Sequence, residues 1–437
     1  MSFSLYPSYK DSGVEWLGEV PEHWKIGRLK NIAKIRSGRD YKDVETEDEE
    51  AIPVIGSGGP FTYATEHLFD GESVLLGRKG TVDNPLYIKG RFWTVDTMFY
   101  TEIDSRAVPK FVYYLATVIP FSYYSTSTAL PSMSQFDLSN HRIVFPGMIE
   151  QKQIARFLGH ETAKIDALIE EQQRLIELLK EKRQAVISHA VTKGLDPSVP
   201  MKDSGVEWLG EVPAHWALAP LKYLAVLNPR KSGFSGDTGL LCSFVPMEKL
   251  KTGALLLDED RPTEEVFGGY TYFENGDILQ AKVTPCFENK NIALAKGLTN
   301  GVGFGSSEIN VIRPGQELDA QYLFYRMQED AYMSICASSM IGAGGLKRVP
   351  TDVINNFVVA IPAVAEQLTI ASYIDSCLAD LDVLAATALE SVRLLQERRS
   401  ALISAAVTGK IDVRDWHPPK SLSYEPHPED KSCLETI

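Results

Sequence analysis

Two stretches of the chain carry mostly apolar residues at intervals that alternate between three and four positions. This spacing continues over several heptads in residues 147–195 and again in residues 363–412. Residues spaced in this way lie along one face of a helix, so both stretches are predicted to be long helices that pack through that face. The positions in the first stretch are Ile154, Leu158, Glu161, Ile165, Leu168, Gln172, Leu175, Leu179, Lys182 and Val186. The positions in the second stretch are Ile370, Ile374, Cys377, Leu381, Leu384, Thr387, Ser391, Leu395, Arg398 and Leu402.

Helices of this length need a partner helix, because one small domain cannot cover their apolar faces. Residues 150–193 alone would extend roughly 65 Å at ~1.5 Å per residue. The simplest arrangement pairs the two helices of one chain as an antiparallel coiled coil with a pseudo-two-fold axis. A coiled coil between two chains, which would give a homodimer, is the alternative. In either arrangement, the polar positions Glu161, Gln172 and Lys182 would specify the register of the two helices.

Short apolar runs separated by Gly- and Pro-bearing turns fill the part of the chain before each helix. Residues 25–146 contain the runs AIPVIG, SVLLGR, PLYIKG and RFWTVDTMFYTEI. A helix is predicted at Pro109–Val118, with the proline in its first position. Residues 217–362 show a similar alternation. These patterns predict a mixed sheet with many loops in each part.

The framework around these two parts is duplicated. The segment KDSGVEWLGEVPEHW of residues 10–24, called the box below, returns at residues 202–216 with fourteen of its fifteen residues unchanged. The two helices begin with EQKQIARFL and EQLTIASYI, and they end with EKRQAVISHAV and ERRSALISAAV. The parts between box and helix show no visible match. A long period that occurs twice indicates duplication of a whole domain. It favours a scaffold with two different recognition surfaces, although two drifted copies without separate roles would leave the same pattern.

These observations predict an α+β fold in which two globular mixed-sheet domains are separated by two long helices. The predicted boundaries are 1–146 for the first domain with its box, 147–195 for the first helix, 196–362 for the second domain with the repeated box, 363–412 for the second helix and 413–437 for a tail. The tail is rich in proline and charge, so it is expected to be disordered.

The composition is that of a globular protein with room for two or three domains. The net charge of −14 argues against a nucleic-acid partner at first. However, residues 25–145 hold 14 basic against 15 acidic residues and residues 217–360 hold 13 against 16, so each part has enough cations for a local basic face. Five cysteines without a C-x-x-C pair fit reduced thiols, and no apolar run is long enough to span a membrane. No signal peptide is recognisable, so a cytoplasmic location is expected.

Sequence motifs of catalysis are missing from the chain. The patterns G-x-S-x-G, H-E-x-x-H and the Walker A loop do not occur. The segment DNPLY at residues 83–87 only partly matches the N-P-P-Y of amino-methyltransferases, and DILQAK at residues 277–282 lacks one acid of a metal-dependent nuclease site. Both are interpreted as ordinary structural segments, so neither a catalytic nor a metal site is expected.

Two kinds of residue are candidates for binding. Arg78 and Lys79 lie between two glycines directly after an apolar run, where backbone N–H groups and side chains can approach phosphates or base edges closely. A solvated hairpin turn is the alternative for this loop. The box tryptophans Trp16, Trp24, Trp208 and Trp216 need burial, either as a lid on the base of their own domain or against a partner protein.

Taken together, the twin boxes, the EQ-x-x-IA helix beginnings and the AV-T-x-x-[LI]-D helix ends resemble the specificity subunit of Type I restriction-modification systems. The resemblance covers essentially the whole chain. It implies two target-recognition domains that each read one half of a split, asymmetric DNA site. It also implies that the helices set the spacer and bind two methyltransferase subunits, which restriction/translocase subunits join. The chain itself would be non-catalytic and bind no cofactor, with S-adenosylmethionine, ATP and Mg expected on the partner subunits.

Within this resemblance the exposed polar loops are the expected contacts to double-stranded DNA, since Arg most often meets guanine or a phosphate. The candidates are Ser57, Arg78, Lys79, Thr81, Lys282, Thr284, Lys290, Ser306, Lys347 and Arg348. Two other functions remain open at this stage. One is a self-contained nuclease or methyltransferase, and the other is a coiled-coil scaffold that does not read DNA.

Overall fold

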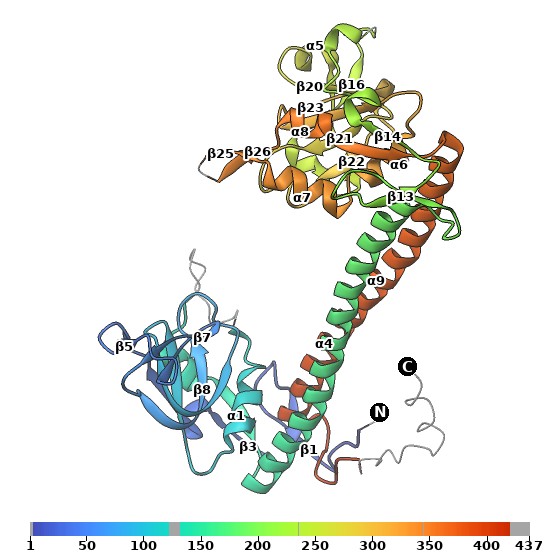
Figure 1. Ribbon diagram of the computed structural model, residues 1–437. Coiled ribbons are helices and arrows are strands. Elements are labelled where there is room, and N and C mark those ends of the chain that lie inside the picture. The colour runs from blue at the N-terminus through green and yellow to red at the C-terminus, as the bar shows by residue number, and fades with distance from the viewer. Residues whose placement is uncertain (1–2, 122–131, 235, 344, 420–437) are drawn as a thin grey trace, which may run out of the picture. The chain divides into compact units, whose positions relative to one another are not determined.

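The computed structural model describes residues 3–121, 132–234, 236–343 and 345–419 (Figure 1). The chain divides into two compact units. Unit 1 comprises Met1–Gln172 and Glu390–Ile437, and unit 2 comprises Gln173–Leu389. Each unit therefore combines one globular part with segments of both long helices. The predicted α+β fold with two mixed-sheet parts and two long helices is confirmed.

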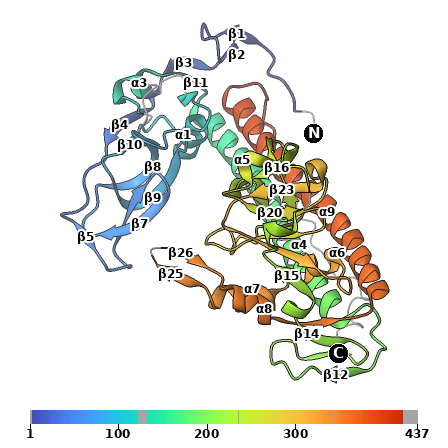
Figure 2. The ribbon, with the colours of Figure 1, turned by 90° about the horizontal axis from the view of Figure 1, so that it is seen from above.

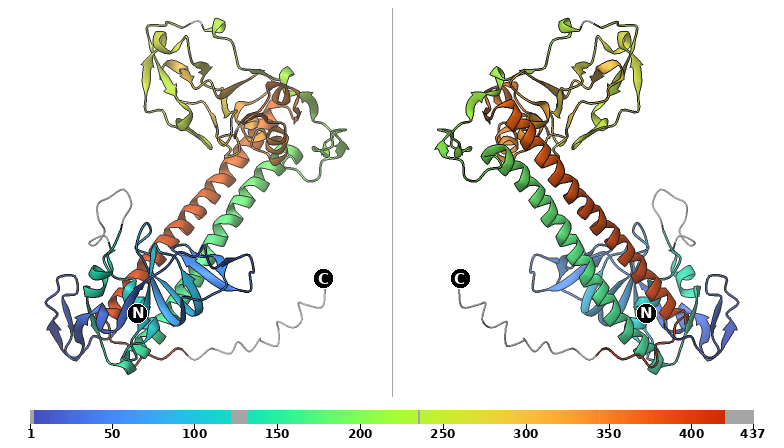
Figure 3. Two further views of the ribbon diagram at one scale, coloured as in Figure 1. Left: turned by 90° about the vertical axis from the view of Figure 1, so that its left-hand side faces the viewer. Right: turned by 90° about the vertical axis from the view of Figure 1, so that its right-hand side faces the viewer.

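The long helices are α4 (Met148–Lys193) and α9 (Val364–Val407). Figure 3 shows them side by side in both of its views. In unit 1, Arg399 Nε donates to Asp166 Oδ1 over 2.7 Å, and in unit 2 Arg183 forms an ion pair with Asp382. The beginning of α4 thus meets the end of α9, and the end of α4 meets the beginning of α9. The helices are antiparallel, and the two ion pairs are related by the duplication.

The buried seam of α4 differs from the predicted one in its middle part. Leu168 and Leu175 are 51% and 40% exposed, and Lys182 is also exposed, whereas Ile176, which was not among the predicted positions, is buried. The sequence is ambiguous here because Leu168 and Leu175 are each followed directly by an isoleucine, so either member of each pair can face the partner helix while the predicted Ile165 and Leu179 stay buried. The helix turns the β-branched residues inward.

A similar difference occurs in α9. Leu384 is 52% exposed, and Thr387 and Arg398 are exposed, although all three were predicted in the seam. Ala388, which is 2% exposed, lies in the seam instead. A small residue at the contact lets two helices approach closely, and the neighbouring leucines are left on the outer face.

The globular part of unit 1 contains a seven-stranded sheet in the order β4-β10-β8-β9-β6-β7-β5. All neighbouring strands are antiparallel except β6 and β9, which are parallel. The strands are β4 (Ala33–Ser37), β5 (Glu45–Thr46), β6 (Ile52–Gly56), β7 (Gly59–Ala64), β8 (Phe69–Gly77), β9 (Leu86–Thr94) and β10 (Met98–Ile103). The helices are α1 (Pro109–Ala116), which begins at the predicted proline, and α3 (Gln135–Asn140).

Unit 2 contains two four-stranded sheets, in the orders β15-β24-β21-β22 and β19-β16-β23-β20. Their strands are β15 (Ala225–Leu227), β16 (Leu241–Val245), β19 (Asp260–Pro262), β20 (Thr271–Glu274), β21 (Ile278–Ala281), β22 (Ile292–Leu294), β23 (Val302–Gly305) and β24 (Ile309–Pro314). Two short hairpins are formed by β17 (Leu250–Lys251) with β18 (Ala254–Leu255), and by β25 (Ile341–Ala343) with β26 (Leu346–Arg348). The helices are α5 (Thr263–Val266), α6 (Ala320–Arg326), α7 (Asp330–Ser338) and α8 (Thr351–Asn356).

The two globular parts share a sheet that their sequences do not reveal. The order β4-β10-β8-β9 in unit 1 corresponds to β15-β24-β21-β22 in unit 2. In both units the third strand of this order pairs antiparallel with the strands on either side. The remaining strands differ, since unit 1 extends the same sheet while unit 2 builds a separate one. The duplication therefore kept a common skeleton and changed what is attached to it.

Each box forms a small hairpin beside its domain. In unit 1, β1 (Tyr9–Asp11) pairs with β2 (Glu19–Pro21), and in unit 2, β12 (Met201–Asp203) pairs with β13 (Glu211–Pro213) in the same register. The chain then enters the domain through β3 (Lys25–Arg28) on β11 (Arg142–Phe145), or β14 (Ala217–Pro220) on β27 (Val358–Ile361). Five single-turn 3-10 helices complete the described elements: Leu29–Asn31, Leu221–Tyr223, Lys231–Gly233, Met247–Lys249 and Thr299–Gly301.

The segment after α9 stays packed beyond the predicted start of the tail. Val413 is 1% exposed, and the ring of Trp416 stands edge-on to Phe157 with 5.2 Å between the centroids. The Gln153 side chain donates to the carbonyl of Val413. The composition of residues 413–437 as a whole is rich in proline and charge, and this average hides the apolar residues at its beginning. Residues 420–437 lie outside the described residues.

In the described part of the chain, no helix combines the length and the apolar character that crossing a membrane requires.

Candidate nucleic-acid interface

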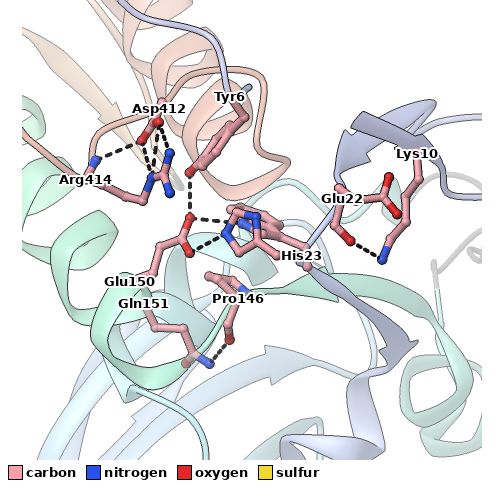
Figure 4. Close-up of polar contacts among 10 residues, drawn as sticks. Tyr6, Lys10, Glu22, His23, Pro146, Glu150, Gln151, Asp412 and Arg414 are labelled. Atoms are coloured by element: carbon pink, nitrogen blue, oxygen red, sulfur yellow. Dashed lines mark hydrogen bonds and ion pairs between the residues drawn. The ribbon is translucent and has the colours of Figure 1, made fainter. Parts of the chain in front are cut away.

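In each unit one glutamate connects the box to the beginning of the long helix, and Figure 4 shows the joint of unit 1. Glu150 accepts from Trp24 Nε1 over 3.0 Å and from the hydroxyl of Tyr6 over 2.8 Å, and its second oxygen lies 2.8 Å from His23 Nε2. Burial and the neighbouring carboxylate raise the pKa of Tyr6, so its hydroxyl remains a donor. The arrangement holds the box, the helix and the N-terminal segment together.

The same joint recurs in unit 2. Glu366 accepts from Trp216 Nε1 over 3.0 Å, and its other oxygen lies 2.9 Å from His215 Nε2. A residue equivalent to Tyr6 is absent from the sequence, since the duplication places Ser198 there. The Glu366 side chain is 35% exposed, compared with 11% for Glu150. The joint of unit 2 is therefore the more accessible to water.

The glutamine that follows each glutamate connects the helix to the domain. The Gln151 amide donates to the carbonyl of Pro146 over 2.9 Å, and its oxygen accepts from the backbone N–H of Val108 over 2.9 Å. Gln367 repeats this arrangement with Pro362 and Asp319. Both glutamines are buried, and a buried amide needs such partners. The repeated EQ pair is thus explained by the joint between the box, the domain and the helix.

The box tryptophans divide into two pairs. Trp24 and Trp216 are 0% and 1% exposed, so both are buried within their own unit, as the alternative of a lid on the domain predicts. Trp16 is 37% exposed and stacks on His141, while Trp208 stacks on Phe357 at 4.4 Å. The partly exposed Trp16 and Trp208 remain candidates for a partner contact.

In unit 1, His141 takes the position that Phe357 has in unit 2, and it can do so because its ring is uncharged. Burial lowers the pKa of His141 to about 4. At neutral pH the ring is therefore neutral, and it can stack on Trp16 as the Phe357 ring stacks on Trp208.

The loop with Arg78 and Lys79 follows β8 in the shared sheet. Both backbone N–H groups donate to the carbonyl of Thr97, and the carbonyl of Arg78 accepts from Met133 N–H over 2.9 Å. The Arg78 guanidinium donates to the carbonyl of Asp96 and lies 5.8 Å from the centre of the Phe99 ring. Arg78 and Lys79 line an open depression of about 370 Å³ together with Ser37, Phe99, Ser132, Met133, Ser134, Gln135 and Asp137.

Glycine is required at the end of β8. A Cβ atom on Gly77 would lie 2.2 Å from the carbonyl oxygen of Thr81, which is far inside a normal contact. The chain therefore folds back tightly over Gly77, and this turn places Arg78 and Lys79 at its outer edge. Thr81 takes part through its backbone, while Ser57 lies on a different loop, between β6 and β7.

Lys282 occupies the place in unit 2 that Arg78 occupies in unit 1. It directly follows β21, its N–H donates to the carbonyl of Glu308, and its carbonyl accepts from Val349 N–H over 2.9 Å. Glu308 precedes β24 as Thr97 precedes β10. A cation thus follows the same strand in two domains whose sequences do not match.

Four of the candidates in unit 2 come together at the β25–β26 hairpin. Thr284 Oγ1 donates to the carbonyl of Gly345 over 2.7 Å and accepts from Lys347 N–H over 2.9 Å. The guanidinium of Arg348 donates twice to the carboxylate of Glu308, with both distances 2.8 Å. This pairing lowers the pKa of Glu308, first through the hydrogen bonds from Arg348 and also through the nearby charge of Lys282.

The other candidates of unit 2 have different surroundings. The Lys290 ammonium donates to Gln184 Oε1 over 2.7 Å and lies 3.4 Å from an Asp330 oxygen, so it is engaged at the side of α4. Ser306 Oγ accepts from Glu308 N–H and shapes the loop that carries this glutamate. Sequence reasoning did not select Glu308, because it searched for cations, although the residue belongs to the same Gly- and Ser-rich loop as Ser306.

Among the residues that the structure describes, no three His, Cys, Asp or Glu side chains gather closely enough to hold a metal ion.

In unit 1 the stretch that corresponds to much of the β25–β26 hairpin falls within residues 122–131, outside the described residues.

Comparison with known proteins agrees with this arrangement. Residues 21–179 match the family described as the Type I restriction modification DNA specificity domain. The EcoEI specificity subunit of Escherichia coli is 34% identical over 197 residues, which are 44% of this chain and 33% of that protein. The EcoAI specificity subunit of the same species is 37% identical over 161 residues, which are 36% of this chain and 27% of that protein. The chain thus spans about a third or less of these relatives' length.

Two further comparisons extend over almost the whole chain. The MjaVIII specificity subunit of Methanocaldococcus jannaschii is 22% identical over 425 residues, which are 91% of this chain and 95% of that protein. A solved chain from work on complex assembly and conformational transition of the type I R-M system has a TM-score of 0.61 at 17% identity. It covers 89% of this chain and 98% of its own length, which shows a shared fold. Residues 21–179 thus match the DNA specificity domain of this family, and the chain as a whole is similar to specificity subunits of Type I restriction-modification systems.

Proposed function

We propose that this chain selects the DNA sequence on which a Type I restriction-modification complex acts. It reads a split, asymmetric site in double-stranded DNA with two target-recognition domains, residues 1–146 and 196–362. The supporting observation is that Arg78 and Lys282 follow the same strand of the shared sheet in domains that otherwise differ. A duplicated frame that keeps a cation in one place while its surroundings change is suited to reading two unlike half-sites.

The division between affinity and specificity follows from DNA chemistry. Contacts to phosphates position a protein on the duplex, and contacts to base edges in the grooves select the sequence. Exposed lysines such as Lys79 and Lys347 suit the first role, because an ammonium is a compact point charge. Arginines suit the second role, because a planar guanidinium can donate two parallel hydrogen bonds to guanine.

The two helices, residues 147–195 and 363–412, connect the domains and bind two methyltransferase subunits, which restriction subunits can join. Leucines of α4 and α9 that are not used in the seam support a protein partner, since they leave apolar surface uncovered. They are Leu168, Leu175, Leu178, Leu368, Leu384, Leu389 and Leu394, which are 40–58% exposed. Trp16 and Trp208 offer further contact area. In this assignment S-adenosylmethionine, ATP and Mg belong to the partner subunits, and this chain carries out no chemistry.

The acidic character of the chain fits such an assembly. A net charge of −14 would not steer an isolated subunit toward DNA. Partner subunits that surround the duplex can supply the positive charge, while this chain supplies the contacts that select bases. We expect the chain alone to bind DNA weakly and the complex to bind it tightly.

The test is methylation-sensitive sequencing of a randomised plasmid library after co-expression of this chain with its methyltransferase subunit. One motif with two unlike parts and a fixed gap supports the proposal. A palindromic motif would indicate a dimer that uses one domain. A stable complex that methylates without sequence preference would contradict the proposal and favour a scaffold. Methylation or cleavage by the purified chain alone would favour a self-contained enzyme.

A further inference from the structure

The ion pair of Arg348 and Glu308 leaves one edge of the guanidinium for a ligand. A guanidinium has two edges that can donate a pair of parallel hydrogen bonds, one formed by Nε and Nη2 and one by Nη1 and Nη2. The first edge is occupied, since Nε and Nη2 both donate to Glu308 over 2.8 Å. Within the described residues Nη1 makes no hydrogen bond. The second edge is therefore available as a ready-made pair of donors.

The element that carries Arg348 is exposed along its whole described length. All six strand residues of the β25–β26 hairpin are exposed, including Ile341 at 72% and Leu346 at 48%. Figures 1 and 2 show the hairpin extending from unit 2 beyond α7 and α8. The Thr284 hydroxyl holds β26 through its hydrogen bonds with Gly345 and Lys347. The major groove of B-form DNA admits a two-stranded ribbon of this kind.

We propose that Arg348 reads a guanine in the major groove of the half-site bound by the second domain, and that Glu308 is the residue that positions it. This inference rests on the proposed function. Nη1 and Nη2 donate to O6 and N7 of guanine, which is the base edge that accepts two parallel hydrogen bonds. Glu308 fixes the plane and the direction of the guanidinium, because it grips the opposite edge with two bonds of its own.

The carboxylate also explains why this arginine selects a base and does not simply bind a phosphate. An unpaired arginine on a flexible hairpin can turn toward any phosphate oxygen along the duplex. With Glu308 attached, the pair carries no net charge, so the general attraction to the backbone is small and the directed hydrogen bonds dominate. In unit 1 the corresponding positions are Ser132 and Thr97, so the first half-site is not expected to be read in this way.

The test compares four variants of the full chain co-expressed with its methyltransferase subunit. R348A removes the reading group, R348K keeps its charge without the planar fork, and E308Q removes the positioning carboxylate. E102Q is the matched control, since Glu102 holds Arg36 by the same two-bond pairing at 2.9 and 3.3 Å. The control pair has similar exposure, 41% and 37% compared with 45% and 30%, and E102Q changes the charge as E308Q does.

The methylated motif of each variant is determined from a randomised library. In the wild type we expect a guanine in the half-site of the second domain. R348A and R348K should lower the preference for this guanine roughly 5- to 150-fold, the loss of one two-bond Arg–guanine contact. E308Q should relax the same position to a smaller extent. The other half-site should be unchanged in all variants, and E102Q should reproduce the wild-type motif.

Other results overturn the inference. A wild-type motif in two parts that R348A leaves unchanged overturns it while the proposed function stands. The same holds if R348A and E308Q change different positions, or if they weaken binding to all sequences equally, as a purely structural role would. A wild type that yields no split motif contradicts the proposed function and this inference together. Thermal melting of each purified variant identifies any that fails to fold. If R348A is such a variant, the motif of R348K is used in its place.

Discussion

Substitution of Glu150 by alanine should loosen the box of unit 1 from its helix. The change removes the acceptor of three donors, of which Trp24 Nε1 and the Tyr6 hydroxyl belong to buried side chains. An unsatisfied buried donor costs ~1–3 kcal/mol. Because Glu150 is still 11% exposed, water can reach part of the space, so the lower half of the range applies. We therefore expect a loss of about 2–4 kcal/mol in the free energy of unfolding of unit 1.

The matched variant is Glu366→Ala in unit 2. Glu366 has the equivalent Trp and His partners but no tyrosine, and it is 35% exposed. It should therefore lose less stability, about 1–2 kcal/mol. A third variant, Glu150→Gln, keeps one acceptor oxygen and places an amide N–H₂ opposite His23 or Trp24. Its effect should lie between those of the wild type and Glu150→Ala.

Calorimetry and hydrogen exchange measure the two consequences separately. For a unit of this size ~1 kcal/mol shifts the melting temperature by about 2–4 °C, so Glu150→Ala should lower it by roughly 4–16 °C. Amide exchange should accelerate in residues 10–24 of this variant and in residues 202–216 of Glu366→Ala. A melting temperature within 1 °C of the wild type, with unchanged exchange in the box, would refute the role of Glu150 as the fastening residue.

Three further outcomes are expected. Insertion of four residues at equivalent positions in both helices adds ~6 Å and should lengthen the unread gap of the methylated motif by roughly 2 bp; an unchanged gap would exclude the helices as its determinant. A circular permutant opened between Ser198 and Val199, with a flexible linker joining the original ends, should fold and methylate the same motif, because Ser4 and Asp412 already pair; loss of folding would contradict this. Arg78→Ala should relax only the half-site that the Glu308 variants leave unchanged, with normal subunit assembly measured by gel filtration.

The boxes and the long helices were predictable because their sequences occur twice in the chain. The repeated segments located both boxes and both helices. The heptad spacing predicted that each helix needs a partner helix, but it left pairing within one chain and pairing between two chains both open. The seam was partly wrong, since Leu168 and Ile169 satisfy the spacing equally well and only side-chain packing decides between them. The shared sheet could not be predicted because many different sequences, most of them apolar, can form a buried strand. SVLLG at the end of β8 and ILQA in β21 occupy equivalent strands without any sequence match.

The candidate site shows a different limit of sequence reasoning. Cations in glycine-bearing loops could be selected from the sequence, and Lys282, Thr284, Lys347 and Arg348 do lie together. Their meeting depends on pairing between strands that are far apart in the chain, which local patterns do not contain. Lys290 has the same local character, yet its ammonium is held by Gln184 and Asp330. Exposure and partners, which only the fold determines, separate these lysines.

The comparison of the two units indicates where specificity can change without loss of the fold. Residues that fasten the frame, such as Glu150 and Gln151, have counterparts with the same partners in the other unit. At the end of the shared strand the backbone hydrogen bonds are also the same, but Thr97 is replaced by Glu308. Because these bonds involve only main-chain atoms, any residue except proline, which lacks a backbone N–H, is compatible with the donor positions. The main chain of this site therefore holds the loops in place, and the side chains are free to differ between the half-sites.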